Sequence, residues 1–397
     1  MAPKNQVLAK HDDDVVIVAA LRSALTKVSY PTSLGELLQQ ADVHRVAKEG
    51  LKTHHLKNFF QPSFAFAGSV NSILLFLLRM PVMYSPPGGA RMAALHAGIP
   101  NTSAVNTVNR QCSSGLTAIN QIAMEIKTGQ IDIGIESPQP SVVIGAGVES
   151  MSQGYGARAL PSASDIIMSN QEAADCLIPM GITSENVAAD YKISREVQDD
   201  FAAKSFQKAA AAQEIIVDYD DGVRDGVTRE SLAKLKPAFS KDGSTHAGNA
   251  SQVSDGAAAV LLARRSVAKH LKLPILGKFV TAAVVGVPPR IMGVGPAYAI
   301  PRVLKQAGLN IPDIDFFEIN EAFASQAVFS IQHLKIPFEK VNPVGGAIAM
   351  GHPLGCTGAR QVATALAHAK RTGEKLFVTS MCIGSGMGMA AVFVNEQ

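Results

Sequence analysis

The segment from Ser103 to Asn120 reads SAVNTVNRQCSSGLTAIN, and the rest of the chain is organised around it. Its β-branched first half predicts a strand that ends at Cys112. The small residues Ser113–Gly115 follow, and apolar residues at helical spacing then predict a helix. A cysteine on the first turn of a helix meets the positive end of the helix dipole, which favours thiolate over thiol. Cys112 is therefore a candidate nucleophile, and the alternative is a buried cysteine that only packs.

Length and composition indicate a large globular protein. The 397 residues leave room for two or three packed units, and 47% of them are hydrophobic while 17% are charged. The net charge of +3 and the absence of Lys/Arg runs give no case for a nucleic-acid partner or a membrane surface. A small basic excess would still suit an acidic ligand, such as a cofactor that carries phosphate.

The cysteines and the apolar runs indicate the kind of cellular compartment in which the protein is expected. The 4 cysteines lie far apart without a CxxC pair, so we expect a reducing compartment and no zinc site. Asp12–Asp14 interrupts any apolar core of a secretory signal, and the C-terminus is not the peroxisomal tripeptide. The most apolar run, Ile73–Met83, is about half the length of a membrane span and contains Arg79 and Pro81.

The first part of the chain mixes strand and helix patterns. No coherent pattern covers His54–Ser85, and Met151–Lys236 predicts a mostly helical insert. Within that insert Thr183–Gln213 is the main helix, with Ser194 as an N-cap. The strands we expect are Asp14–Ala20, Ile131–Ile135, Ser141–Gly147 and Ala257–Leu262, and the other helices are Leu34–Leu51 and Ala90–Gly98.

The pattern around Cys112 recurs near the C-terminus. The helix opened by Gly355–Gly358 has nearly the length of the one after Cys112, and both end in Lys, Thr and Gly. This similarity predicts two βαβ-type halves that flank the insert, with a ligand site where the halves meet. The other elements we expect in the second half are the strands Ile275–Val287, Asp315–Ile319, Leu376–Met381 and Met389–Val394 and the helices Ala297–Ala307 and Ala322–Leu334.

Four segments gather reactive residues at strand ends and helix starts. They are Cys112 itself, Asn320–Phe323 after a strand, Gly351–Pro353 around His352, and Cys382–Gly388 after another strand. Each has an ordinary alternative when taken singly. A loop histidine is often only structural, and an Asn-Glu pair after a strand is often a helix cap. The glycine-rich run after Cys382 leads into a strand, which argues against a phosphate-binding loop.

Together these motifs resemble the signatures of the thiolases, the acyl-CoA C-acetyltransferases. Four motifs occur in the order in which the family has them: VNRQCSSG, NEAFA, GHPLGCTG and MCIGSGMG. A fifth, GNASQVSDGAAA, lies at Gly248–Ala259. The resemblance covers roughly Asp14–Thr26 and Pro86–Gln397. Within the family, QVSDGAAAVLLARRS and LPILGKFVTAAVVGVPPRIMGVGP look most like the peroxisomal 3-ketoacyl-CoA thiolases of fatty-acid β-oxidation.

The resemblance implies an α/β, thiolase-like fold. Two duplicated βαβ-type halves would form a five-layered α-β-α-β-α core, with a mostly helical loop domain inserted. The implied N-terminal half consists of residues 14–150 and is completed by residues 253–274. Residues 151–252 would form a loop domain that contributes to CoA binding, and residues 275–397 the C-terminal half.

The resemblance also assigns chemical roles. It implies that Cys112 is the acylated nucleophile and that His352 takes its proton and helps to hold the thioester oxygen. Cys382 would be the acid/base at the α-carbon of the acetyl unit.

Further residues are implied to stabilise oxyanions or to bind CoA. Asn320 would position a water that completes the first oxyanion site, and the N–H groups of Cys112 and Gly384 would form the second. Arg224 and Ser251 match positions at the CoA-binding surface.

The implied activity is cleavage of a 3-ketoacyl-CoA by CoA into acetyl-CoA and a shortened acyl-CoA, by a ping-pong route through acyl-Cys112. CoA is then a substrate, and neither a metal nor a redox cofactor is expected. The resemblance implies a homodimer or tetramer in peroxisomes, with mitochondria or cytosol as alternatives. Two other functions stay open: an acetoacetyl-CoA thiolase working in the biosynthetic direction, and a catalytically impaired or non-catalytic acyl-CoA-binding relative.

Three places depart from the family pattern. Ser29–Ser85 lacks the family's glycine pair and the second strand expected before Pro86. Glu136–Ile144 resembles an insertion, and a strand pair is missing between Gln213 and Glu214, near the CoA tail. We hypothesise that misjoined coding segments account for these departures, in which case folding and dimerisation would be affected.

Overall fold

The stretch that holds Cys112 forms a strand, a turn and a helix. In the computed structural model β4 (Val105–Val108) leads into the short 3-10 turn η3 (Gln111–Ser113), which runs directly into α6 (Ser114–Thr128). α6 ends at Gly129, whose φ of 71° is the left-handed conformation that suits glycine. The structure describes residues 3–23, 25–27, 64–68, 90–91, 95, 105–130, 143–151, 163–213 and 220–397.

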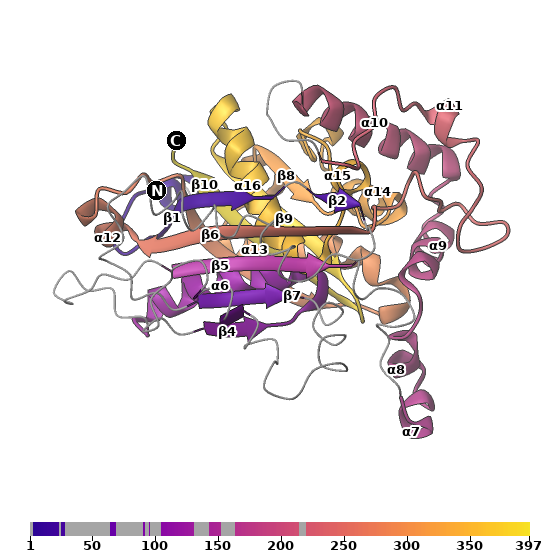
Figure 1. Cartoon of the computed structure of the whole chain (residues 1–397), viewed down its shortest axis with the longest axis horizontal. Helices are drawn as coiled ribbons and strands as arrows, with labels where there is room; N and C mark the ends of the chain where they lie inside the picture. The colour runs from indigo at the N-terminus through magenta and orange to yellow at the C-terminus, as the bar shows by residue number, and fades with distance from the viewer. Residues whose placement is uncertain are drawn as a thin grey trace.

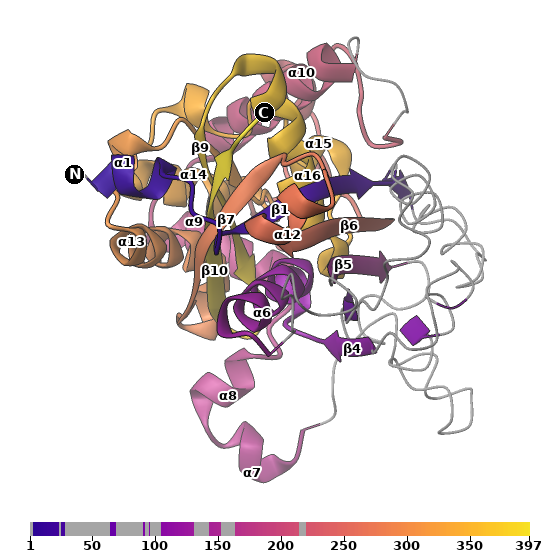
Figure 2. The same cartoon turned by 90° about the vertical axis from the view of Figure 1, so that its left-hand side faces the viewer.

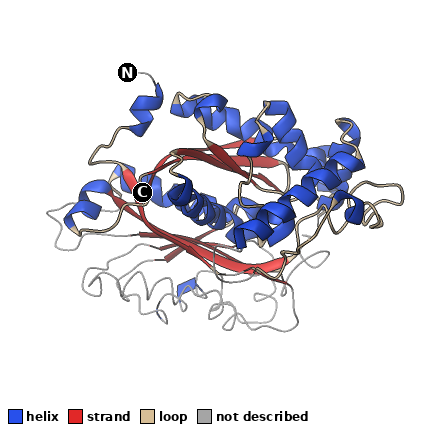
Figure 3. Ribbon diagram, turned by 90° about the horizontal axis from the view of Figure 1, so that it is seen from above, coloured by secondary structure: helices blue, strands red, loops and turns tan. Residues whose placement is uncertain are grey.

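The described strands follow one path that divides into two layers (Figures 1 and 3). The order is β4-β3-β5-β6-β1-β7-β10-β9-β8, with β2 beside β6. β1 and β7 pair at Val16–Lys278 and Ile17–Gly277, so the two layers are joined by a short stretch of strand pairing. The strands other than β4 are β1 (Val15–Arg22), β2 (Thr26–Lys27), β3 (Phe64–Gly68), β5 (Val143–Ser150), β6 (Ser254–Arg264), β7 (Gly277–Gly286), β8 (Phe316–Ile319), β9 (Leu376–Ile383) and β10 (Met387–Asn395).

The two layers have the same internal topology. In the first layer β1–β6 and β6–β5 are antiparallel, and β5–β3 and β3–β4 are parallel. In the second, β7–β10 and β10–β9 are antiparallel and β9–β8 is parallel. A parallel bridge from Phe317 to Val341 occupies the place that β4 has in the first layer. The duplication predicted from the sequence is therefore confirmed in the strand order.

Helices fill the space between the layers and cover their outer faces. α6 and α16 (Leu354–Thr372) bury Leu116, Ile119 and Val362 in a core shared with both sheets. Figure 3 shows helices between the two layers of strands. α13 (Gly295–Ala307) and α14 (Ala324–Leu334) pack on the outer face of the second sheet, and α12 (Arg265–His270) on that of the first. This arrangement is the five-layered α/β fold expected from the sequence.

The two central helices cross with their backbones in contact. A Cβ atom added at Gly115 of α6 would lie 2.8 Å from the Ala359 nitrogen and 2.9 Å from the Gly355 oxygen. A Cβ atom at Gly358 of α16 would overlap the backbone of Leu116. Only glycine permits this distance, which brings the N-terminal ends of the two equivalent helices together.

The insert is helical, as predicted, but its main helix is broken in two. α9 (Met180–Asp190) and α10 (Arg195–Gln213) are separated at Lys192, which has a φ of 55°. Ser194 accepts the Val197 N–H at 3.4 Å, as a residue at the N-cap position does. α7 (Asp165–Met168) and α8 (Gln171–Asp175) extend away from the sheets in both Figures 1 and 2. The remaining described helices are α1 (Pro3–Leu8), α11 (Arg229–Leu232) and α15 (Ala347–Met350), with 3-10 turns at η5 (Pro289–Val294), η6 (Ile311–Asp313) and η7 (Phe338–Lys340).

One expectation about the first half was wrong. The second strand that Ser29–Ser85 was expected to lack is present as β3, which lies between β4 and β5 and is parallel to both. Its five residues are too few to show a hydrophobic period, and its register is set by the neighbouring strands. Val143 and Ile144, assigned to an insertion, begin β5. The other residues of Glu136–Ile144 lie outside the described residues. So do three other predicted elements, in whole or in large part: Ile131–Ile135, Leu34–Leu51 and most of Ala90–Gly98.

No helix among the described residues is both long enough and apolar enough to span a bilayer.

Gly358→Ala tests the contact between the central helices. Alanine is the better helix former by about 1 kcal/mol, but its methyl group would press on the Leu116 backbone. The overlap should cost about 1–3 kcal/mol, so we expect a net loss of up to about 2 kcal/mol in the free energy of unfolding, measured by urea denaturation followed by circular dichroism. Gly286→Ala is the matched control, because nothing lies within 4 Å of its added Cβ. Equal urea midpoints for the two variants would contradict the proposed crossing.

Candidate active site

Cys112 is held in a turn that the neighbouring hydroxyl groups stabilise. The Ser114 hydroxyl accepts the Arg110 N–H at 2.9 Å and donates to the Gln111 carbonyl at 2.7 Å. The Ser113 hydroxyl donates to the Arg110 carbonyl at 3.1 Å. Gln111 has a φ of 47°, so the chain turns sharply just before the cysteine. The thiol of Cys112 is 2% exposed and lies directly before α6.

Burial decides the protonation state of Cys112. Desolvation raises the pKa of the Cys112 thiol to about 12, although a hydrogen bond from the Gly384 N–H opposes the shift. The prediction that the helix end favours the thiolate was therefore wrong for the free protein. The dipole effect is worth at most a few kcal/mol, and removing a thiolate from water costs more. A base must take the proton before Cys112 can act as a nucleophile.

His352 is buried in its neutral form. The Thr357 hydroxyl donates to the Pro353 carbonyl at 3.0 Å, so it must accept from His352 Nδ1, which lies 2.6 Å away. Nε2 therefore carries the free electron pair. Burial, with a smaller contribution from the Arg360 charge, lowers the pKa of His352 to about 3. The imidazole is unprotonated at neutral pH and can accept a proton at Nε2.

Asn320 lies beside His352 at the end of β8. Its backbone N–H donates to the Ser380 carbonyl of β9 at 2.8 Å, which fixes the residue to the neighbouring strand. Its Nδ2 is 3.2 Å from His352 Nε2. Its Oδ1 is buried and has no hydrogen-bond partner among the described residues. A buried oxygen of this kind can accept from a water molecule, which is the role expected from the sequence.

Cys382 and Gly384 reach the same place from the other half. Cys382 is 1% exposed near the end of β9, and burial, then the nearby Cys112, raises its pKa. Gly384 follows in the turn to β10. A side chain at Gly384 would overlap the Gln111 side chain, so glycine allows the turn to approach Cys112 and donate its N–H. The structure thus brings together Cys112, Cys382 and Gly384, as the sequence predicted.

The two predicted CoA-binding residues lie on loops that are bonded to the site. The Ser251 N–H donates to the Ala322 carbonyl at 3.0 Å, next to Asn320. The adjacent Gln252 donates to the Gly222 carbonyl at 2.8 Å, in the turn that carries the exposed Arg224. Hydrogen bonds therefore link the loop of Ser251 to the turn before Arg224.

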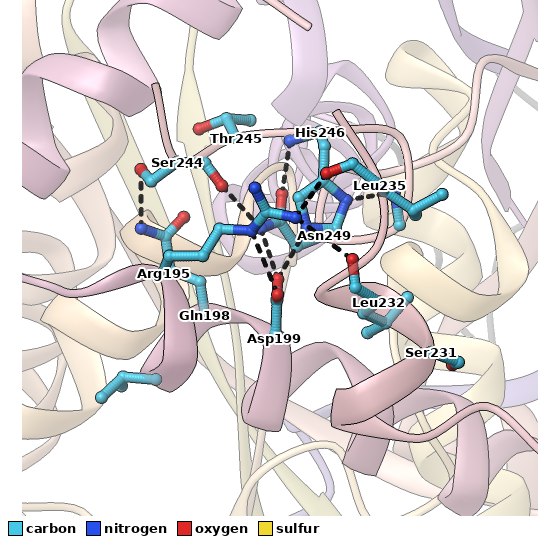
Figure 4. A network of polar contacts seen from close by, with 12 residues as sticks. Arg195, Gln198, Asp199, Ser231, Leu232, Leu235, Ser244, Thr245, His246 and Asn249 are labelled. Carbon is cyan, nitrogen blue, oxygen red and sulfur yellow. Dashed lines mark hydrogen bonds and ion pairs between the residues drawn. The ribbon is translucent and has the colours of Figure 1, made fainter. Parts of the chain in front are cut away.

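A buried polar network fixes the loop that leads to Ser251 (Figure 4). Asp199 on α10 accepts from His246 Nε2 at 2.6 Å, from Asn249 Nδ2 at 3.0 Å and from Arg195 Nε at 3.1 Å. Arg195 also donates to the Leu235 carbonyl at 2.7 Å. The sequence analysis missed this network. The pair Arg195 and Asp199, one helical turn apart, was its only visible signal.

Glu321, considered in the sequence only as part of a possible helix cap, has a different role. Its buried carboxylate accepts from the Ser205 hydroxyl at 2.6 Å, Asn342 Nδ2 at 2.7 Å and the Ile348 N–H at 3.1 Å. These contacts join α10 of the insert to the segment around Asn320. Its position beside Asn320 in the sequence could have drawn attention to it.

Within the part of the chain that the structure describes, no three His, Cys, Asp or Glu side chains are arranged to hold a metal ion.

The duplicated fold brings Cys382 near Cys112, and the neutral His352 lies beside Asn320, an arrangement suited to acyl transfer through a thiol. Models of the thiolase N-terminal domain and of the thiolase C-terminal domain match residues 86–266 and 273–395. The chain belongs to the thiolase family.

Particular relatives narrow this family. The chain is 51% identical to the peroxisomal 3-ketoacyl-CoA thiolase of Yarrowia lipolytica, over 98% of this chain and 95% of that protein. It is 56% identical to the human peroxisomal 3-ketoacyl-CoA thiolase over 77% of this chain and 75% of that protein. The crystal structure of the dimeric peroxisomal thiolase of Saccharomyces cerevisiae matches with a TM-score of 0.85 and 47% identity, covering 99% of this chain and all of that one.

The raised pKa of Cys112 predicts slow alkylation of the free protein. With a pKa of about 12, the thiolate fraction should rise about tenfold per pH unit from pH 7 to 9.5 without a plateau. The rate of iodoacetamide attachment to the Cys112 peptide, followed by mass spectrometry, measures this. A peptide thiol, whose rate levels off above its pKa of about 8.5, is the control. A plateau near that value for Cys112 would contradict the assignment.

Proposed function

We propose that this chain is a 3-ketoacyl-CoA thiolase, which uses CoA to cleave a 3-ketoacyl-CoA into acetyl-CoA and a shortened acyl-CoA. The observation that carries the proposal is the pair of buried thiols, Cys112 and Cys382, which lie near each other although they come from different halves. His352, which is neutral, lies against Asn320. The names of the relatives support the same reaction, in peroxisomal fatty-acid β-oxidation.

The first chemical step requires a base for Cys112. His352 Nε2 accepts the thiol proton, and the sulfur attacks the 3-keto carbon of the substrate. The bond between the α-carbon and that carbon then breaks and leaves an acyl thioester on Cys112 and the enolate of acetyl-CoA. The neutral state of His352 supports this role, because an imidazolium could not take the proton.

The enolate needs a proton and both oxyanions need donors. Cys382 gives its proton to the α-carbon of the enolate. The thiol of a second CoA then returns a proton to the Cys382 thiolate and attacks the acyl thioester, and the Cys112 sulfur leaves with the proton that His352 had taken. The N–H groups of Cys112 and Gly384 stabilise one oxyanion. His352 and a water held by Asn320 stabilise the other, each site contributing roughly 3 kcal/mol. The unpaired Oδ1 of Asn320 supports the water.

CoA enters this proposal as a substrate. Residues 151–252 form the loop domain, between the halves 14–150 (completed by 253–274) and 275–397, and Arg224 and Ser251 contact CoA. The net reaction transfers an acyl group without oxidation or reduction, so no redox cofactor or metal is assigned. We propose a homodimer in peroxisomes, because the similar Saccharomyces cerevisiae structure is a dimeric peroxisomal thiolase and the relatives are peroxisomal.

Chain-length dependence tests the substrate class. We expect thiolysis of a long 3-ketoacyl-CoA with a several-fold higher kcat/KM than thiolysis of acetoacetyl-CoA, measured on purified protein of known oligomeric state. Activity confined to acetoacetyl-CoA would favour the biosynthetic alternative. Substrate binding without turnover would favour the non-catalytic one.

Two cysteine variants test the division of roles. Cys112→Ser removes the sulfur nucleophile and should abolish the burst of acyl-enzyme. Cys382→Ser should leave acylation of Cys112 intact while exchange of the acetyl-CoA α-protons with deuterated water falls about 10²–10⁴-fold. Mass spectrometry of the Cys112 peptide and of acetyl-CoA measures both. Full turnover in Cys112→Ser, or undiminished exchange in Cys382→Ser, would refute the assigned roles.

A further inference from the structure

The thiol of Cys382 has one hydrogen-bond acceptor in the described structure. It donates to Gln326 Oε1, with 3.5 Å between sulfur and oxygen. Both side chains are buried, Cys382 being 1% and Gln326 2% exposed. Gln326 lies in the first turn of α14, which begins directly after the segment that carries Asn320. The residue that contacts the Cys382 thiol is therefore fixed to the same corner of the second half.

The other end of the same carboxamide is unpaired. Gln326 Nε2 is buried and has no hydrogen-bond partner among the described residues. A buried amide N–H without a partner is unfavourable, and native structures rarely retain one without a reason. Purely structural packing of this position would be served as well by an apolar side chain of similar size, such as methionine.

We propose that Gln326 is a positioning residue that bonds to Cys382 in both of its protonation states by turning its carboxamide. This inference rests on the proposed function, in which Cys382 gives its proton to the α-carbon. In that step the S–H bond breaks, a C–H bond forms and the negative charge moves to sulfur. Oε1 can accept from the thiol but repels the thiolate. A half-turn of the terminal torsion presents Nε2–H to the sulfur instead.

Rotation of the Gln326 carboxamide costs little free energy because its Nε2 is unpaired among the described residues. Because Nε2 has no other partner, the rotation breaks only the bond from the thiol, which no longer exists once the proton has left. A hydrogen bond to a charged acceptor is stronger than one between neutral groups. Gln326 would therefore lower the barrier for transfer of the α-proton in either direction, without taking part in the acylation of Cys112.

Gly293 in η5 provides the room for this carboxamide. A Cβ atom added at Gly293 would overlap Cγ, Cδ and Nε2 of Gln326. The adjacent Met292 packs in one apolar cluster with Cys382. A methyl group at position 293 would thus displace the carboxamide while leaving Gln326 and Cys382 themselves unaltered, which gives a second way to test the same contact.

The experiment compares two reactions in each variant. One is exchange of the acetyl-CoA α-protons with deuterated water, and the other is acetylation of Cys112 by acetyl-CoA, both followed by mass spectrometry. We expect exchange to fall about 10- to 100-fold in Gln326→Met and in Gly293→Ala, the loss of one hydrogen bond to a charged group. Cys112 acetylation should stay within about twofold of the unaltered protein.

The controls separate this role from a structural one. Gly286→Ala, where the added methyl group meets nothing within 4 Å, should leave both reactions unchanged. Thermal melting shows which variants fold. If Gln326→Met does not fold, Gly293→Ala tests the role of Gln326 in α-proton exchange. Undiminished exchange in a folded variant, or an equal fall in both reactions, would overturn the assignment. Lack of Cys112 acetylation in the unaltered protein would refute the proposed function. This outcome is distinct from those that would refute the role of Gln326.

Discussion

The structure depends on one contact between two helix backbones. α6 and α16 cross where Gly115 and Gly358 face each other, and a side chain at either position would meet backbone atoms of the other helix. The crossing sits at the N-terminal ends of both helices, and each of those ends carries a reactive residue just before it. Cys112 precedes α6, and His352 precedes α16. The fold's internal symmetry is thus what brings residues of the two halves together.

The same close packing removes water from the site and so sets its chemistry. Burial raises the pKa of Cys112 to about 12 and lowers that of His352 to about 3, so both groups are neutral in the free protein. Keeping the thiol and the imidazole neutral avoids burying a charge in surroundings that solvate charge poorly. Charge has to develop only when a substrate supplies a carbonyl to attack. In the free protein the Gly384 N–H bonds to the Cys112 sulfur.

Sequence patterns predicted the features that local chemistry fixes. The glycines that end α6 and α16 have φ values of 71° and 76°, as the two Lys-Thr-Gly-like endings indicated. The thiolate prediction failed because desolvation is a property of the tertiary packing, which spacing does not record. β3 escaped notice because five residues between two parallel neighbours need no period of their own. The network of Asp199 and His246 joins residues distant in sequence. The roles of the site residues stay predictions.

Two adjacent residues connect the chemistry to the insert. Asn320 points toward His352, while Glu321 points the other way and accepts from Ser205 on α10 and from Asn342. Burial raises the pKa of Glu321, and the donors around it oppose that shift. A displacement of α10 would leave this buried carboxylate short of a partner, which is costly. Glu321 therefore holds α10 of the insert in place relative to Asn320 and the buried site.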